Sequence, residues 1–116
     1  MKKYHVVFHI DEHSKGRADQ ALRNIENLLN DLGQDHVEIE LVANGGAVKE
    51  FVKGTDSHAD QVEKLVARGV NFVVCANSLN ILEINKELLL ESVHIVPAGV
   101  GELVRKQADG WGYIKP

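Results

Sequence analysis

Two kinds of hydrophobic pattern alternate along this chain of 116 residues. The first is a short, nearly continuous apolar run rich in β-branched and aromatic side chains, which is typical of a strand covered on both faces. Such runs predict strands at residues 4–10, 37–43, 70–75, 93–97 and 111–115. In the second strand Glu38 and Glu40 alternate with apolar residues, so its beginning is expected to be more exposed than its end.

The second pattern places apolar residues three and four positions apart, as on one face of a helix. It is clearest at residues 17–32, where Ser14 is positioned to cap the first turn and Gly33 to end the helix. Further helices are expected at residues 47–52, 58–67, 78–92 and 99–109.

The later part of the chain supports finer expectations. A turn is predicted at 54–57, and the fourth helix is expected to divide into two pieces around Asn85. In the last helix Leu103 and Val104 are expected to face the core. Because strands alternate with helices, we predict parallel βαβ units with right-handed crossovers, in a single α/β domain over residues 1–116.

Composition and charge argue against several classes of function. The formal net charge is −4, and the basic residues are scattered rather than gathered in a stripe, so nucleic acid is not an expected partner. A single cysteine cannot form an internal disulfide, which fits a reducing compartment and a cytoplasmic location. The first residues lack a signal-peptide pattern, and no apolar run approaches the ~20 residues that cross a bilayer, so no membrane is expected either.

Polar, small and reactive residues follow each predicted strand. In open parallel sheets, ligands bind outside the carboxyl ends of the strands. These residues are therefore expected to converge on one edge of the sheet. They are His9, Asp11 and His13 after the first strand, Asn44, Gly45 and Gly46 after the second, Cys75, Asn77 and Ser78 after the third, and Gly99 and Gly101 after the fourth.

Cys75 is the most distinctive of these residues, because it ends a strand just before a predicted helix. The free amides and positive dipole end of a helix favour a thiolate, and Asn77 or Ser78 could cap that helix or donate to a bound anion. His9 is the candidate acid or base beside the thiol. The alternative is that Cys75 is a small buried hydrophobic residue and that the polarity around His9 belongs to an ordinary loop.

The sequence indicates no metal and no cofactor. The string His9, Asp11, His13 matches no standard zinc spacing, and there is no second cysteine to help. Neither a dinucleotide fingerprint nor a phosphate-binding loop with Lys and Ser or Thr is present. The glycine pairs that follow the second and fourth strands, at 45–46 and at 99 and 101, either approach a ligand closely or form simple turns.

Three segments together resemble the DsrE/DsrF-like family, in particular its small, stand-alone archaeal and bacterial members. They are Val6-Val7-Phe8-His9-Ile10-Asp11, Cys75-Ala76-Asn77-Ser78-Leu79, and Gly99-Val100-Gly101-Glu102-Leu103-Val104 continuing through Gln107, Gly110-Trp111 and Tyr113-Ile114. Their order and spacing cover essentially the whole chain. The resemblance implies a three-layer α/β/α, Rossmann-like fold with a mainly parallel five-stranded sheet. It also implies a homo-oligomer, often a trimer or hexamer.

The better-understood relatives take part in intracellular sulfur oxidation and sulfur relay, where a cysteine after the third strand carries sulfur as a persulfide. Cys75 matches that position. Established carriers often have Arg-Gly soon after the cysteine, whereas residues 81–85 of this chain contain no cation and include Glu83. A sulfur donor or acceptor protein is the partner that the resemblance implies.

These observations leave three interpretations open. In the first, a partly exposed Cys75 holds a persulfide as a sulfur carrier or sulfurtransferase, His9 moves the proton, and Asp11, Asn44, Gly45, Asn77, Ser78, Gly99 and Gly101 surround the ligand. In the second, the strand-end pocket binds a small anion or nucleotide-like ligand without catalysis, and Cys75 is structural. In the third, the chain is an oligomeric scaffold whose function lies in a partner.

Overall fold

Five parallel strands form one sheet in the computed structural model, which describes residues 2–54 and 57–116. Their order across the sheet is β4-β3-β2-β1-β5, so the last strand pairs with the first. The strands are β1 (Tyr4–Ile10), β2 (Val37–Ala43), β3 (Asn71–Cys75), β4 (Val93–Val96) and β5 (Gly112–Ile114). Each lies within one residue of, or inside, its predicted range, and the predicted parallel α/β architecture is confirmed.

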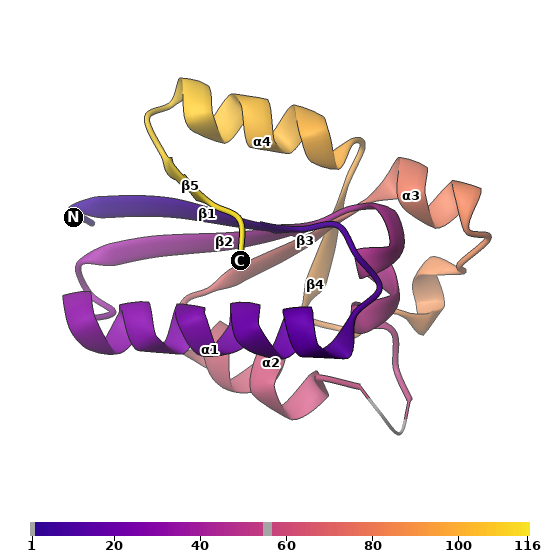
Figure 1. Ribbon diagram of the computed structural model, residues 1–116, viewed down its shortest axis with the longest axis horizontal. Helices are drawn as coiled ribbons and strands as arrows, with labels where there is room; N and C mark the ends of the chain where they lie inside the picture. Colours follow the sequence, from indigo (N-terminus) through magenta and orange to yellow (C-terminus); the bar gives the residue numbers. More distant parts are fainter. Residues whose placement is uncertain (1, 55–56) are drawn as a thin grey trace.

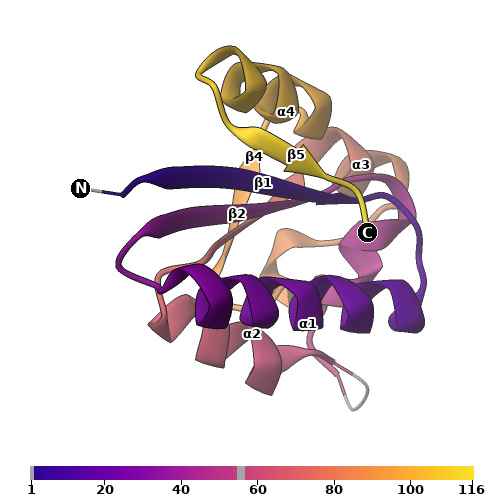
Figure 2. The ribbon, with the colours of Figure 1, turned by 60° about the vertical axis from the view of Figure 1, so that its left-hand side comes forward.

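Helices cover both faces of the sheet, as Figures 1 and 2 show. Two of them, α1 (Lys15–Leu32) and α2 (Ala59–Ala67), lie on one face, and α4 (Gly99–Ala108) lies on the other. Three short elements, α3 (Ala76–Ile81) and the 3-10 turns η1 (Gly45–Phe51) and η2 (Lys86–Leu88), lie beyond the carboxyl ends of the strands (Figure 1). None of the described helices is both long and apolar enough to cross a membrane.

The longest helix, α1, begins and ends as its sequence predicts. The Ser14 hydroxyl accepts a hydrogen bond of 3.1 Å from the amide of Arg17, which caps the first turn. Gly33 ends the helix with a positive φ of 90°, a conformation that glycine adopts without strain. The apolar face of α1 is buried against the sheet through Ala18, Ala21, Leu22, Ile25 and Leu29.

The two faces of the sheet carry cores of very different size, because successive side chains of a strand point to opposite faces. The larger core lies under α1 and α2. The smaller one, under α4, centres on Val7, Val42, Val73 and Leu103. The prediction that Val104 also faces inward is wrong, since its side chain is 66% exposed. One step along a helix turns a side chain by ~100°, and a single helix over the sheet leaves no second layer to cover it.

Glu40 of β2 is a charged residue buried beneath α4. It is 1% exposed, whereas Glu38, two residues earlier on the same face of the strand, lies at the surface. Lys106 of α4 covers it, with Nζ 3.3 Å from Glu40 Oε2, although Oε2 accepts no hydrogen bond. Burial, then a hydrogen bond and repulsion from Glu102, raise the pKa of Glu40 to about 7, and Lys106 opposes this. The hydrogen bond with Glu40 in turn holds the pKa of Glu102 below its ordinary value. The proton of this carboxyl pair therefore resides on Glu40.

The predicted division around Asn85 is confirmed, because Asn85 precedes η2 and follows α3, but the helical extent predicted at 78–92 is wrong. Helix α3 ends at Ile81, and Glu83 takes a positive φ of 55°, which breaks the helical path. The chain then runs back along the end of η1, where Leu90 donates its amide to the carbonyl of Phe51 at 2.9 Å. Pairing with a distant segment has replaced the local helical preference. The predicted turn at 54–57 includes residues 55 and 56, which lie outside the described residues.

Candidate functional site

Cys75 ends β3 and occupies the residue before the first turn of α3. Burial raises the pKa of its thiol, but hydrogen bonds from the Ser78 hydroxyl and from the backbone amides of Gly99, Ser78 and Asn77 outweigh burial. The pKa of Cys75 is therefore below its usual value, and the thiolate is favoured. Only 6% of the residue is exposed, so the partly exposed thiol expected of a sulfur carrier is not what the monomer shows.

The Ser78 hydroxyl is held in place by the turn after β2. The amide of Gly45 donates to Ser78 Oγ at 2.7 Å, which leaves the hydroxyl proton for the sulfur of Cys75. Gly45 has a φ of 56°, and a Cβ there would lie 3.0 Å from the carbonyl oxygen of Asp11. Position 45 therefore requires glycine for both its conformation and its close approach to the first strand-end loop.

Gly99 brings the beginning of α4 against the thiol. A Cβ at this position would lie 3.0 Å from the Cβ of Asn44 and 3.3 Å from the Cβ of Cys75. The missing side chain thus allows the Gly99 amide to reach the sulfur. Amides from the starts of α3 and α4 converge on one atom, so backbone donors surround the candidate nucleophile from two sides.

His9 lies on the same face of the sheet, where both of its ring nitrogens have partners. Nε2 is 2.8 Å from Asn44 Oδ1, and Nδ1 is 2.6 Å from the Tyr113 hydroxyl. Because Oδ1 can only accept, Nε2 carries a proton and, in the neutral ring, Nδ1 accepts from Tyr113. His9 therefore fixes Asn44, which in turn packs beside Gly99. Its role as a proton carrier stays a prediction.

Three other residues of the predicted site make contacts of a different kind. Asp11 pairs with Lys115 at 3.1 Å, and that hydrogen bond lowers the pKa of Asp11. A side chain at Gly101 would meet the Arg105 guanidinium rather than the thiol. Asn77 contributes its backbone amide while its side chain is exposed. The residues that contact one another around the thiol are thus Cys75, Ser78, Gly45, Gly99, Asn44 and His9.

The histidines and aspartate of the string 9–13 are directed to three different partners. His13 Nε2 lies 3.2 Å from Glu50 Oε2, away from Asn44 and Lys115, which bind His9 and Asp11. In the described part of the chain, no group of three or more His, Cys, Asp or Glu side chains is arranged to hold a metal ion.

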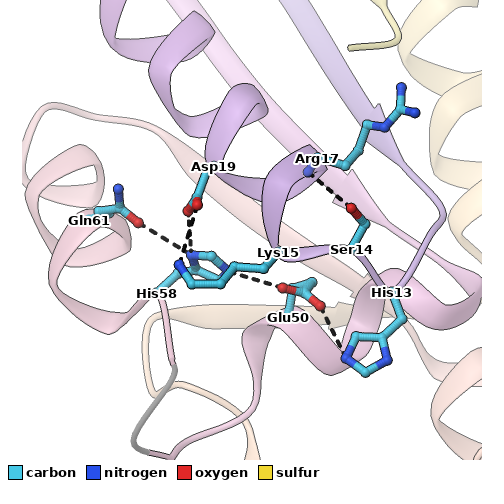
Figure 3. A network of polar contacts seen from close by, with 8 residues as sticks. All are labelled: His13, Ser14, Lys15, Arg17, Asp19, Glu50, His58 and Gln61. Carbon is cyan, nitrogen blue, oxygen red and sulfur yellow. Dashed lines mark hydrogen bonds and ion pairs between the residues drawn. The ribbon is translucent and has the colours of Figure 1, made fainter.

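Sequence reasoning missed two features. The first is Tyr113, since only the position of β5 beside β1 shows that it meets His9. The second is a buried polar network, drawn in Figure 3, in which His58 bridges two carboxylates. Its Nε2 is 3.0 Å from Glu50, and its Nδ1 is 3.3 Å from Asp19. No pattern in the sequence pairs these residues, since they come from η1, α1 and the residue before α2.

Comparison with known proteins places this architecture. The model of the DsrE/DsrF-like family matches residues 2–116. The chain belongs to the DsrE/DsrF-like family. Among curated proteins, none matches.

Two solved structures extend the comparison within this DsrE-like fold. The protein of unknown function MTH1491 from Methanobacterium thermoautotrophicum is 40% identical in sequence, with a TM-score of 0.89 over 97% of this chain and 99% of that one. The ychN protein from E. coli matches over 100% of both chains with a TM-score of 0.78. At 17% identity, that second likeness concerns the fold alone.

Proposed function

We propose that this DsrE-like protein is a sulfur carrier that holds a persulfide on Cys75. The observation that supports the proposal best is the set of four donors around the sulfur, namely the Ser78 hydroxyl and the amides of Gly99, Ser78 and Asn77, which lower the pKa of the thiol. A single cysteine suits the reducing cytoplasm, where we propose that this chemistry takes place.

The proposed reaction is a transfer of sulfane sulfur in two exchange steps. The Cys75 thiolate attacks the outer sulfur of a donor persulfide, a new S–S bond forms, and the donor leaves as its thiolate. The proton of the donor persulfide remains with the transferred sulfur. An acceptor thiolate then attacks that outer sulfur, and Cys75 leaves as the thiolate again. No external oxidant or reductant is consumed, because each step breaks one S–S bond and forms another.

The neighbouring residues have distinct proposed roles. The amides and the Ser78 hydroxyl stabilise the negative sulfur before attack and after each departure. These donors would serve in place of a cation, which residues 81–85 lack. His9 is the proposed proton carrier only for ionisation of the Cys75 thiol before attack, because the exchange steps themselves move no proton, and through Asn44 it also shapes the wall opposite Gly99.

The test is to measure alkylation of native Cys75 against pH and then to incubate the protein with a cysteine persulfide and record its intact mass. We expect the Cys75 thiol to ionise at lower pH than free cysteine does. We also expect the protein to gain the mass of one sulfur atom and to keep it. The Cys75→Ser variant, which has no thiol, should gain none. If the native thiol reacts only after denaturant is added, the proposal is wrong.

A second candidate is favoured by one observation, the 6% exposure of Cys75. In this alternative the strand-end donors bind a small anion or nucleotide-like ligand, and Cys75 packs among them without reacting. Cys75→Ser should then retain the full thermal stabilisation given by such a ligand. A large loss of that stabilisation would contradict the alternative and favour a direct role for the sulfur.

We also propose that the protein assembles into a homo-oligomer, a trimer or hexamer. Exposed apolar side chains on α4 and on the edge strand β4 support this: Val100 is 61% exposed, Val104 66% and Ile95 41%. Val100 and Val104 lie one turn apart on α4, and exposed apolar side chains in such proximity mark interaction surfaces. Light scattering after gel filtration should show the oligomer, and Val104→Glu should dissociate it whereas Leu88→Glu, on η2, should not. A monomer at all concentrations would refute the assembly.

A further inference from the structure

We propose that a cavity beside η1, separate from Cys75, binds a multiply charged oxyanion of the phosphate or sulfate type. The cavity has a volume of about 550 Å3, within the range of small-molecule sites. Its lining is mostly charged and polar, and includes Lys15, Lys49, Lys53, His13, Glu50 and Ser57. None of the residues that donate to Cys75 lines it.

The charge of the cavity is the first argument. Three lysines line one concavity in a chain whose formal net charge is −4. Lys15 forms an ion pair with Asp19, with its Nζ 3.3 Å from Asp19 Oδ2. Among the described residues, no carboxylate lies within 4.0 Å of the ammonium of Lys49 or Lys53. Within the part of the chain that the structure describes, these two groups have no carboxylate partner and can bind a ligand of opposite charge.

The second argument is that Glu50, the only carboxylate among the described residues of the lining, is already engaged. Glu50 is 7% exposed, and its two oxygens bind different histidines, Oε1 to His58 at 3.0 Å and Oε2 to His13 at 3.2 Å. Figure 3 shows how Asp19 and Gln61 hold the far side of His58. Glu50 thus anchors His13 at the wall instead of neutralising the lysines.

The backbone around His13 makes this wall rigid. A Cβ at Gly46 would lie 3.0 Å from the amide nitrogen of His13, so the first strand-end loop and η1 are in direct contact. His13 comes from that loop, Lys49 and Glu50 from η1, and Lys15 from the first turn of α1. The buried network around His58 holds His13 through Glu50 and Lys15 through Asp19, so this part of the site is preorganised, which reduces the cost of ordering on binding.

The first probe is inorganic phosphate, which is titrated into the full chain while sodium chloride keeps the ionic strength constant. Binding is followed by NMR through the chemical shifts of the backbone amides. We expect saturable shifts near His13 and residues 49–53. Lys49→Gln and Lys53→Gln should each weaken binding about tenfold, as expected for the loss of a charge-assisted hydrogen bond. Lys86→Gln removes the same charge from an exposed residue outside the cavity and should leave affinity unchanged.

Shifts that stay linear in phosphate and equal those caused by chloride would overturn the proposal, as would equal losses in Lys49→Gln and Lys86→Gln. Because the cavity exceeds the size of one phosphate, a sugar phosphate and the matching free sugar form the second arm. Tighter binding of the sugar phosphate identifies the anion as the head of a larger molecule. Equal binding of phosphate and sugar phosphate identifies the free ion as the ligand.

Discussion

Replacing Glu40 by Gln tests the charge buried beneath α4. In the folded chain the pKa of Glu40 is about 7, against an ordinary value of 4.5, chiefly because burial disfavours the carboxylate. A proton on Glu40 also supplies a donor for Glu102, which two carboxylates cannot offer one another. Because the folded state binds this proton more tightly than the unfolded state, protonation of Glu40 stabilises the fold.

The sign and size of the effect follow from linkage. The contribution of Glu40 is fully present below pH 4.5 and is lost as the pH rises through about 7. The difference between the two pKa values corresponds to at most about 3 kcal/mol in the free energy of unfolding. Glu102 has its pKa lowered, so its contribution is lost only as the pH falls into the acid range. Of these two carboxyls, only Glu40 therefore changes its contribution between about pH 5 and 8.

Urea denaturation at several pH values in that range measures the free energy of unfolding directly. The natural chain should lose stability as the pH rises, whereas Glu40→Gln, which cannot ionise, should have a flatter profile and be the more stable of the two at about pH 8. Glu38→Gln is the matched control, since Glu38 is exposed one pleat earlier on the same strand, and its profile should follow that of the natural chain. Parallel profiles for all three proteins would refute the assigned position of the proton.

Three further substitutions test the site and the fold. Ser78→Ala should raise the pKa of Cys75 and slow its alkylation near neutral pH several-fold, because a donor to the thiolate is lost; an unchanged pH profile would contradict this. Gly99→Ala should destabilise the chain by about 1–3 kcal/mol in thermal or urea unfolding, since the new Cβ lies 3.0 Å from that of Asn44; unchanged stability would show that α4 shifts freely. Ser14→Ala should cost about 1 kcal/mol through loss of the helix cap, and a cost near zero would show that water replaces the hydroxyl.

The sequence predicted the elements that local interactions stabilise, or whose apolar pattern is compatible with only one type of secondary structure. The helix from Lys15 has one apolar face and a capping serine, so only its first two residues were missed. The helical extent predicted after α3 is wrong because residues 88–90 pair with residues 51–53, at and just beyond the end of η1, and no periodicity reports a partner so distant in the sequence. Glu40 alternates with apolar residues as an exposed residue would, and its burial depends on the reach of Lys106 from another helix.

The candidate site could be predicted in outline for a simple reason. Parallel strands end at one edge, so Asn44, Cys75 and Gly99 had to be neighbours once the strands were identified. The identity of the donors to the thiol depends on contacts of about 3 Å, such as Gly45 to Ser78, which spacing alone cannot give. For the same reason Tyr113 and the network around His58 were outside the reach of the sequence.

The pairing of β5 with β1 has a consequence for the order in which the molecule matures. Tyr113, which holds His9, is separated from it by 104 positions in the chain. During synthesis β1 and β2 can pair early, yet one edge of β1 stays open and His9 lacks one of its two partners until Tyr113 has left the ribosome. The wall beside the thiol is therefore completed only after β5 has been made, so nascent chains that lack β5 would not carry a finished site.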